Sequence, residues 1–134
     1  MKVRSGEVRG GEVRDGGSWE ELGRVVERMD AHLDEEVGFP YRLAPLAQDW
    51  ARIVKVVEEA GEAVEALMGL TGQNPRKGHY GVEMDLWSEL ADVTMTGLYA
   101  LQHFTKDREL TMELLLKRAQ YHEERVFGDG DDDA

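Results

Sequence analysis

Apolar residues recur at intervals of three and four along most of this chain, and this spacing restricts its fold more than any other feature. The stretch after Ser18 shows it in Leu22, Val25, Val26, Met29 and Leu33. Such spacing gathers apolar side chains on one side of an α-helix, whereas a half-buried strand requires strict alternation. No segment of the chain shows that alternation. The sequence therefore predicts an all-α protein.

Residues that start or stop helices divide the chain into four expected helices. Ser18 opens the first with a capping box, and Pro45 suits the first turn of the second. Gly72 is a natural stop for that second helix, and Asp107 is a natural N-cap for the fourth. The expected helices span about 18–38, 45–70, 82–104 and 107–127.

The length of 134 residues is sufficient for one domain with a hydrophobic core. We expect a four-helix bundle over residues 18–127. Residues 1–17 repeat the letters GEVR among glycines, and residues 128–134 are acidic. Both ends are predicted to be flexible tails.

Composition excludes several classes of function. The chain has no cysteine, which rules out disulfides, thiolate catalysis and cysteine-ligated zinc. It lacks both the roughly 20-residue apolar run of a membrane span and an apolar secretory signal, so a cytoplasmic protein is expected. A net charge of −12 argues against general nucleic-acid binding, which requires basic surface.

The second expected helix has an apolar side and an acidic side. A narrow apolar sector, which we expect to pack on other helices, contains Leu46, Trp50, Ile53, Val57, Val64 and Met68. Glu59 and Glu62 lie nearly opposite, with Lys55 between them in angle, and Glu58 and Glu65 lie on the flank. Like charges at such spacing repel, so this arrangement requires an explanation.

The third expected helix repeats this division. Its apolar sector contains Leu86, Leu90, Val93, Gly97, Leu101 and Phe104. A polar stripe at least a quarter-turn away contains Asp85, Glu89, Asp92, Thr96, Tyr99 and His103. Since the stripe contains no lysine or arginine, it suggests the lining of a cavity rather than an ordinary solvated face.

Two pairs of acids at i, i+3 suggest a metal site. The pair Glu27 and Asp30 has the same spacing, and we assign it to the surface. Antiparallel neighbouring helices, however, would bring Glu59 and Glu62 against the pair formed by Glu89 and Asp92. Four converging carboxylates repel one another unless cations lie among them, and such hard oxygen ligands favour Mg²⁺ or Mn²⁺.

These residues resemble a known family. EEAGE, with Glu58, Glu59 and Glu62, followed by ELAD, with Glu89 and Asp92, is similar to the signature of the MazG-like all-α nucleoside triphosphate pyrophosphohydrolases. The resemblance covers residues 18–127. It implies Mg²⁺-dependent cleavage of a nucleotide between its α- and β-phosphates, which gives a monophosphate and pyrophosphate.

The resemblance also implies roles for individual residues. Glu59, Glu62, Glu89 and Asp92 would be the metal ligands. Glu58 would orient or deprotonate the attacking water. Relatives in this family are commonly homo-oligomers, so a homodimer or homotetramer is expected.

Further residues have both a functional and a structural interpretation. Lys55 would contact a substrate phosphate or form an ion pair one turn along the helix. Arg76 and Lys77 would hold the pyrophosphate end of the substrate or lie exposed in their loop. Trp50 would stack on a base or pack in a core or interface, and Tyr99 would contact the substrate.

Two alternatives to a nucleoside triphosphate pyrophosphohydrolase remain open. Phosphoribosyl-ATP hydrolysis uses a related helical scaffold. A non-catalytic helical interaction module would have kept the fold and lost turnover. Ser88, which stands where the family often has a further acid, is the feature that most favours this module.

Overall fold

A computed structural model describes residues 18–36 and 45–128, and in them the chain forms four α-helices and no strand. The all-α, four-helix fold is therefore confirmed. The expected tails lie outside the described residues, apart from Gly128. The helices are α1 (Trp19–Glu36), α2 (Pro45–Thr71), α3 (Glu83–Thr105) and α4 (Arg108–Phe127).

Local chemistry explains where these helices begin and end. The Ser18 hydroxyl accepts the backbone N–H of Glu21 at 3.2 Å, and a carboxylate oxygen of Asp107 accepts that of Leu110 at 3.0 Å. Both contacts satisfy N–H groups that have no partner within their helix. Gly72 directly follows α2 with φ of +65°, a left-handed conformation that glycine adopts readily.

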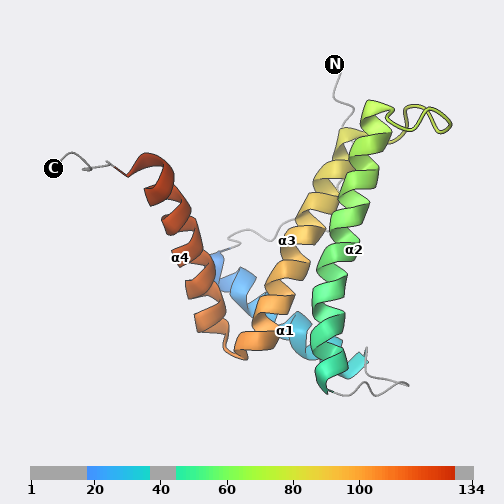
Figure 1. Ribbon diagram of the computed structural model, residues 1–134. Helices are drawn as coiled ribbons and strands as arrows, with labels where there is room; N and C mark the ends of the chain where they lie inside the picture. The colour runs from blue at the N-terminus through green and yellow to red at the C-terminus, as the bar shows by residue number, and fades with distance from the viewer. Residues whose placement is uncertain (1–17, 37–44, 129–134) are drawn as a thin grey trace.

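The helices α2 and α3 lie side by side in opposite directions, and α1 crosses near the lower end of this pair (Figure 1). The helix α4 turns back after α3 and leans away from it. The loop between α2 and α3 folds onto the end of α2, where the N–H of Tyr80 donates to the carbonyl of Gly69 at 2.9 Å. This hairpin aligns the carboxylates of one helix with those of the other.

The hydrophobic core of one chain is small. Five hydrophobic residues of the described chain are buried: Val26, Ala63, Leu98, Ala100 and Met112. Val26, Leu98, Ala100 and Met112 belong to α1, α3 and α4, which contact one another, whereas Ala63 lies between α2 and α3. Among the described helices, none is both long enough and apolar enough to cross a lipid bilayer.

The apolar sector of α2 does not pack on the other helices, so that prediction is wrong within one chain. Leu46, Trp50 and Val57 are exposed by 64–67 %, and Ile53 and Val64 by 45 % and 57 %. The opposite side of α2 faces α3 instead. There Glu59 and Ala63 are buried, since the small alanine lets the two helices approach.

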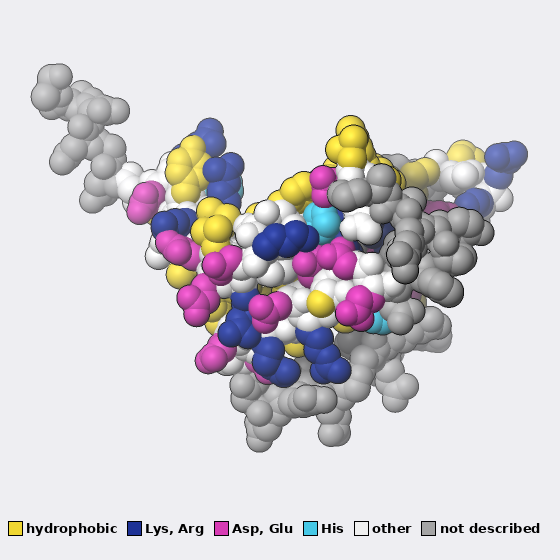
Figure 2. Space-filling model, turned by 90° about the horizontal axis from the view of Figure 1, so that it is seen from below, with side chains coloured by type: hydrophobic (Ala, Val, Ile, Leu, Met, Phe, Trp, Pro, Cys, Tyr) yellow, Lys and Arg dark blue, Asp and Glu magenta, His cyan; other side chains and the backbone are white. Residues whose placement is uncertain are grey.

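The apolar sector of α3 is only partly covered. Leu90 and Phe104 are about half exposed, while His103, from the polar stripe, is buried. Seen from below, acidic and basic side chains are interspersed over the middle of the molecule, and hydrophobic side chains gather along the upper edge of the view (Figure 2). Both long helices therefore bury a polar residue, Glu59 or His103, while several of their large apolar residues remain exposed.

Candidate metal centre

Carboxylates from α2 and α3 meet between the two helices. Glu59, Glu89 and Asp92 each offer an oxygen, and these oxygens all lie within 4.8 Å of one another. Glu59 is buried, Glu89 is half-buried and Asp92 is exposed, so the group extends from the helix interface to the surface. Three of the four residues expected to bind metal are thus brought together.

The fourth, Glu62, lies beside Glu89. Burial raises the pKa of the Glu89 carboxyl, and the negative charges of Glu62, Asp92 and Glu59 raise it further. This dependence on three neighbouring acids shows that the four side chains share one electrostatic environment. An arrangement of this kind stabilises any cation placed among the oxygens.

Lys55 partly balances this group. Its ammonium nitrogen lies 2.7 Å from a carboxylate oxygen of Glu59 and 3.2 Å from one of Glu58. A hydrogen bond to Glu59 is the largest cause of the raised pKa of Lys55. The ion pair expected within α2 is therefore present, and Glu58, on the exposed flank, contacts Lys55 rather than the other carboxylates.

A cavity of about 500 Å³ lies among α1, α2 and α3, and part of the carboxylate group lines one end of it. Glu59, Asp92 and Lys55 line this end. Tyr99 also lines the cavity, and burial followed by the charge of Asp92 raises the pKa of its phenol. A second cavity of about 330 Å³, lined by Glu62 and Glu89 among others, lies on the other side of the group.

The remaining expected contacts lie away from this cavity. Lys77 pairs with Glu65 at 3.1 Å, and its ammonium lies 5.7 Å from the centre of the Tyr80 ring. Arg76 is exposed in the loop and lines neither cavity. Trp50 is exposed by 64 % on the outer side of α2. In the described structure, these three side chains do not contribute to the carboxylate site.

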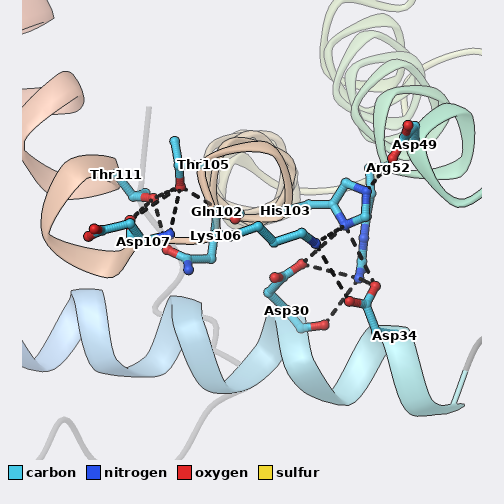
Figure 3. Close-up of polar contacts among 10 residues, drawn as sticks. All are labelled: Asp30, Asp34, Asp49, Arg52, Gln102, His103, Thr105, Lys106, Asp107 and Thr111. Atoms are coloured by element: carbon cyan, nitrogen blue, oxygen red, sulfur yellow. Dashed lines mark hydrogen bonds and ion pairs between the residues drawn. The ribbon is translucent and has the colours of Figure 1, made fainter. Parts of the chain in front are cut away.

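A second polar network at the far end of the cavity was not anticipated. The sequence predicts a surface position for Asp30, but Asp30 is buried, so that prediction is wrong. Glu27, the other acid of that i, i+3 pair, is exposed and pairs with Arg108. The network joins three helices (Figure 3). Its members are Asp30 and Asp34 of α1, Asp49 and Arg52 of α2, and His103 and Lys106 at the end of α3.

Arg52 is the centre of this network. One terminal nitrogen, Nη2, donates to the carbonyl of Asp30 at 3.1 Å and to the carboxylate of Asp34 at 2.7 Å. The His103 ring contacts Asp49 at 2.7 Å and lies 3.6 Å from Asp34. The sequence contains one sign of this network. Asp30 and Asp34 are like charges one turn apart on α1, and such a pair is stabilised by nearby cations.

Comparison of this chain with protein-family models, with curated proteins and with solved structures found no match. Its functional interpretation therefore rests on the residues and on their geometry.

Proposed function

We propose that this protein is a Mg²⁺-dependent pyrophosphohydrolase that cleaves a nucleoside triphosphate into a monophosphate and pyrophosphate. The observation that carries the proposal is the convergence of Glu59, Glu89 and Asp92, whose oxygens lie within 4.8 Å of one another, beside a 500 Å³ cavity that Glu59 and Asp92 line. A cavity of this size accommodates a small organic ligand. The order of the acids along the chain, which resembles the MazG-like signature, supports the same reaction.

The donor atoms fit a hard divalent cation. All are carboxylate oxygens, which is the ligand type that Mg²⁺ and Mn²⁺ prefer. Glu59, Glu62, Glu89 and Asp92 would hold the metal from two helices that fix their positions. When bound, Mg²⁺ neutralises phosphate oxygens and lowers the pKa of a water molecule.

Protein side chains supply the other parts of the reaction. Lys55 is a cation beside the carboxylates and is well placed to pair with a phosphate oxygen. Glu58 is half exposed beside Lys55 and is the proposed group that orients or deprotonates the attacking water. Tyr99 contributes a hydroxyl to the cavity wall. A phenol with the ordinary pKa of 10.0 is already protonated at neutral pH, and burial followed by the charge of Asp92 raises the pKa of Tyr99 further.

Pyrophosphate release tests this function. The purified chain is incubated with Mg²⁺ and a panel of ribo- and deoxyribonucleoside triphosphates, with phosphoribosyl-ATP included. We expect pyrophosphate and the matching monophosphate from at least one nucleoside triphosphate, and no release in EDTA. Turnover of phosphoribosyl-ATP alone would instead favour a phosphoribosyl-ATP pyrophosphohydrolase. If no compound is hydrolysed, the proposal that the protein is a nucleotide pyrophosphohydrolase is contradicted.

The proposed assembly is a homodimer formed through α2. We call Leu46, Trp50, Ile53, Val57, Ala60, Val64 and Leu67 the α2 seam. They follow one another at alternating intervals of four and three residues, which is the heptad spacing of a helix that pairs with a similar helix. Valine at positions 57 and 64 with leucine at 46 and 67 is the pattern that favours two-stranded pairing.

The α2 seam also supports the second candidate function, a non-catalytic interaction module. Every member of the seam except Ala60 is exposed by 45 % or more in a single chain. Such a wide apolar surface is typical of a protein interface. The nucleotide panel separates the two functions, because an interaction module forms the same assembly without releasing pyrophosphate.

A further inference from the structure

The 500 Å³ cavity has three chemically distinct parts. Glu59, Asp92 and Lys55 line one end, as described above. The walls are mainly apolar, with Met29 and Leu33 from α1 facing the cavity together with Met95 from α3. Methionine and leucine walls suit a flat, weakly polar body, because methionine adapts to irregular contacts and its sulfur packs well on aromatic rings.

The other end of the cavity is polar and contains both donors and acceptors. Asp34, Gln48 and Arg52 line it. All contacts of the Arg52 guanidinium use Nη2, and its other N–H groups make no hydrogen bond to a described residue. The Gln48 side chain likewise makes none within the described part of the chain, although it is half-buried.

These groups are available to a ligand. Among the described residues, Asp30 Oδ1 is the one buried side-chain polar atom without a hydrogen-bond partner, so the unused groups of Arg52 and Gln48 are open to solvent at the cavity. A ligand that enters the cavity can therefore hydrogen-bond them in place of water. Arg52 precedes Glu59 by two helical turns, which separates the two ends by about 10 Å along α2. A ligand that fills the cavity therefore has an anionic end, a flat body and a polar edge with acceptors and donors.

We propose that this cavity binds the nucleobase and sugar of the substrate, and that Gln48 and Arg52 hydrogen-bond the edge of the base. This inference rests on the proposed function, which supplies the phosphates at the carboxylate end. The base lies between Met29 and Met95, and Asp34 offers an acceptor to N–H groups of its edge. Gln48 is the specificity-determining residue, because its amide is not engaged by other described residues.

Methyl NMR of methionine tests the site directly. The chain is labelled with ¹³C at its methionine methyl groups. Each common nucleoside monophosphate is then titrated into it, first in a buffer with EDTA and again in a buffer with Mg²⁺. We expect the signals of Met29 and Met95 to shift with at least one of them. Met112, buried away from the cavity, is the internal control.

Inorganic pyrophosphate at the same concentrations separates a base site from a phosphate site. Shifts of Met29 and Met95 with a nucleotide, but not with pyrophosphate, are expected. Equal shifts with both ligands, or no shift with any nucleotide in either buffer, would overturn the proposal. Binding in EDTA does not require turnover, so a chain that binds monophosphates but releases no pyrophosphate refutes the hydrolase alone.

Substitution of Gln48 tests its role. Gln48→Leu keeps the size of the side chain and removes one neutral hydrogen-bonding group, so nucleotide affinity should fall about fivefold. The order of preference among the four bases should also change. Gln120→Leu makes the same change on the exposed side of α4 and should leave affinity unchanged. Unaltered affinity and base preference in Gln48→Leu would rule out the assigned role.

Filling the cavity provides a second variant. Ala51→Phe places a ring into the space that the base is proposed to occupy, since Ala51 lines the cavity. We expect monophosphate binding to be lost while the far-ultraviolet circular dichroism spectrum is retained. Ala119→Phe adds the same ring to the exposed surface of α4 as a control. A folded Ala51→Phe protein that still binds nucleotides would contradict a base in this cavity.

Discussion

Glu59 is a buried acid that the fold places beside two other acids and one lysine. The Lys55 ammonium at 2.7 Å compensates one charge, whereas Glu89 and Asp92 add further negative charges within 4.8 Å. A buried charge is tolerated only when it is paired or coordinated. One lysine does not balance four carboxylates, and this excess of negative charge is what the proposed Mg²⁺ would remove.

Substitution of a single proposed ligand should separate metal binding from folding. In Asp92→Asn we expect both Mg²⁺ affinity and activity to fall. Mutating a residue that only hydrogen-bonds a metal ligand typically lowers affinity roughly 10–100-fold, so loss of a ligand itself should cost at least as much. Stability without metal should not decrease, because one repelling charge is removed. Isothermal titration and urea unfolding measure the two effects. Glu124→Gln, an exposed acid of α4, is the matched control. Unchanged Mg²⁺ affinity would exclude Asp92 as a ligand.

Asp30 provides a test at a different site. Burial raises the pKa of its carboxyl above the ordinary value of 3.8, although Arg52 acts in the opposite direction. An acid with a raised pKa destabilises the fold when ionised, and this effect disappears as the pH falls through that pKa toward 3.8. The ionised Asp30 therefore reduces stability at neutral pH.

Asp30→Asn keeps the shape of the side chain and cannot ionise. We expect this variant to unfold at a higher temperature than the parent at pH 7, with the difference narrowing as the pH approaches 4. Thermal unfolding across this range is the measurement. Glu123→Gln controls for the change in net charge, because it lies on the exposed face of α4. A variant less stable than the parent at pH 7 would show that the ion pair with Arg52 outweighs burial.

At the scale of elements, α4 depends on its cap. Asp107 accepts the N–H of Leu110 at 3.0 Å, and α4 contributes little to the hydrophobic core. Asp107→Ala should therefore reduce the free energy of unfolding by about 1 kcal/mol, and Asp107→Asn by clearly less because it retains an acceptor. Urea unfolding measures both. Equal losses in the two variants would mean that the charge, and not the hydrogen bond, stabilises the helix.

The orientation of α2 is decided by packing rather than by hydrophobicity. Ala63 and Glu59 face α3, while the larger apolar residues Val57 and Val64 face outward. Small side chains allow close approach of the helix axes, and the wide apolar side then remains available to a partner. The helix α2 is thus amphipathic as expected, but its acidic side faces α3 and its apolar side faces outward.

At the scale of the whole molecule, this outward face predicts self-association. Val57→Glu places a charge in the middle of the α2 seam and should convert the dimer into a monomer. Sedimentation velocity measures the change. Val126→Glu is the matched control, because Val126 is 68 % exposed and Val57 67 %, but it lies in α4 outside the seam. A parent protein that is already monomeric at high concentration would contradict the proposed assembly.

Metal binding should also stabilise the whole fold. A ligand that binds only the folded state raises its stability by about 2.7 kcal/mol at a concentration 100 times its dissociation constant. We therefore expect a higher melting temperature in millimolar Mg²⁺ than in EDTA, and no such difference in Asp92→Asn. Sodium chloride at matched ionic strength controls for screening. Equal melting temperatures in Mg²⁺ and EDTA would count against the metal centre.

Much of this molecule follows from short-range features of its sequence. Pro45, Gly72 and Asp107 mark helix ends through their own backbone and hydrogen-bonding chemistry, and the observed ends agree closely. The matching heights of Glu59 and Asp92 also follow, because antiparallel helices joined by one loop align residues that lie at similar distances from that loop. These inferences need only helical periodicity and a hairpin.

Other features depend on which faces meet, and only the tertiary structure decided them. Asp30 is buried because α1 crosses the α2–α3 pair and brings it against Arg52 and His103, residues distant in sequence. The cavity and its polar end at Gln48 arise from the same crossing. Periodicity determines which residues share a side of a helix. It does not determine whether that side meets a neighbour in the same chain, because packing energy depends on the shapes of both surfaces.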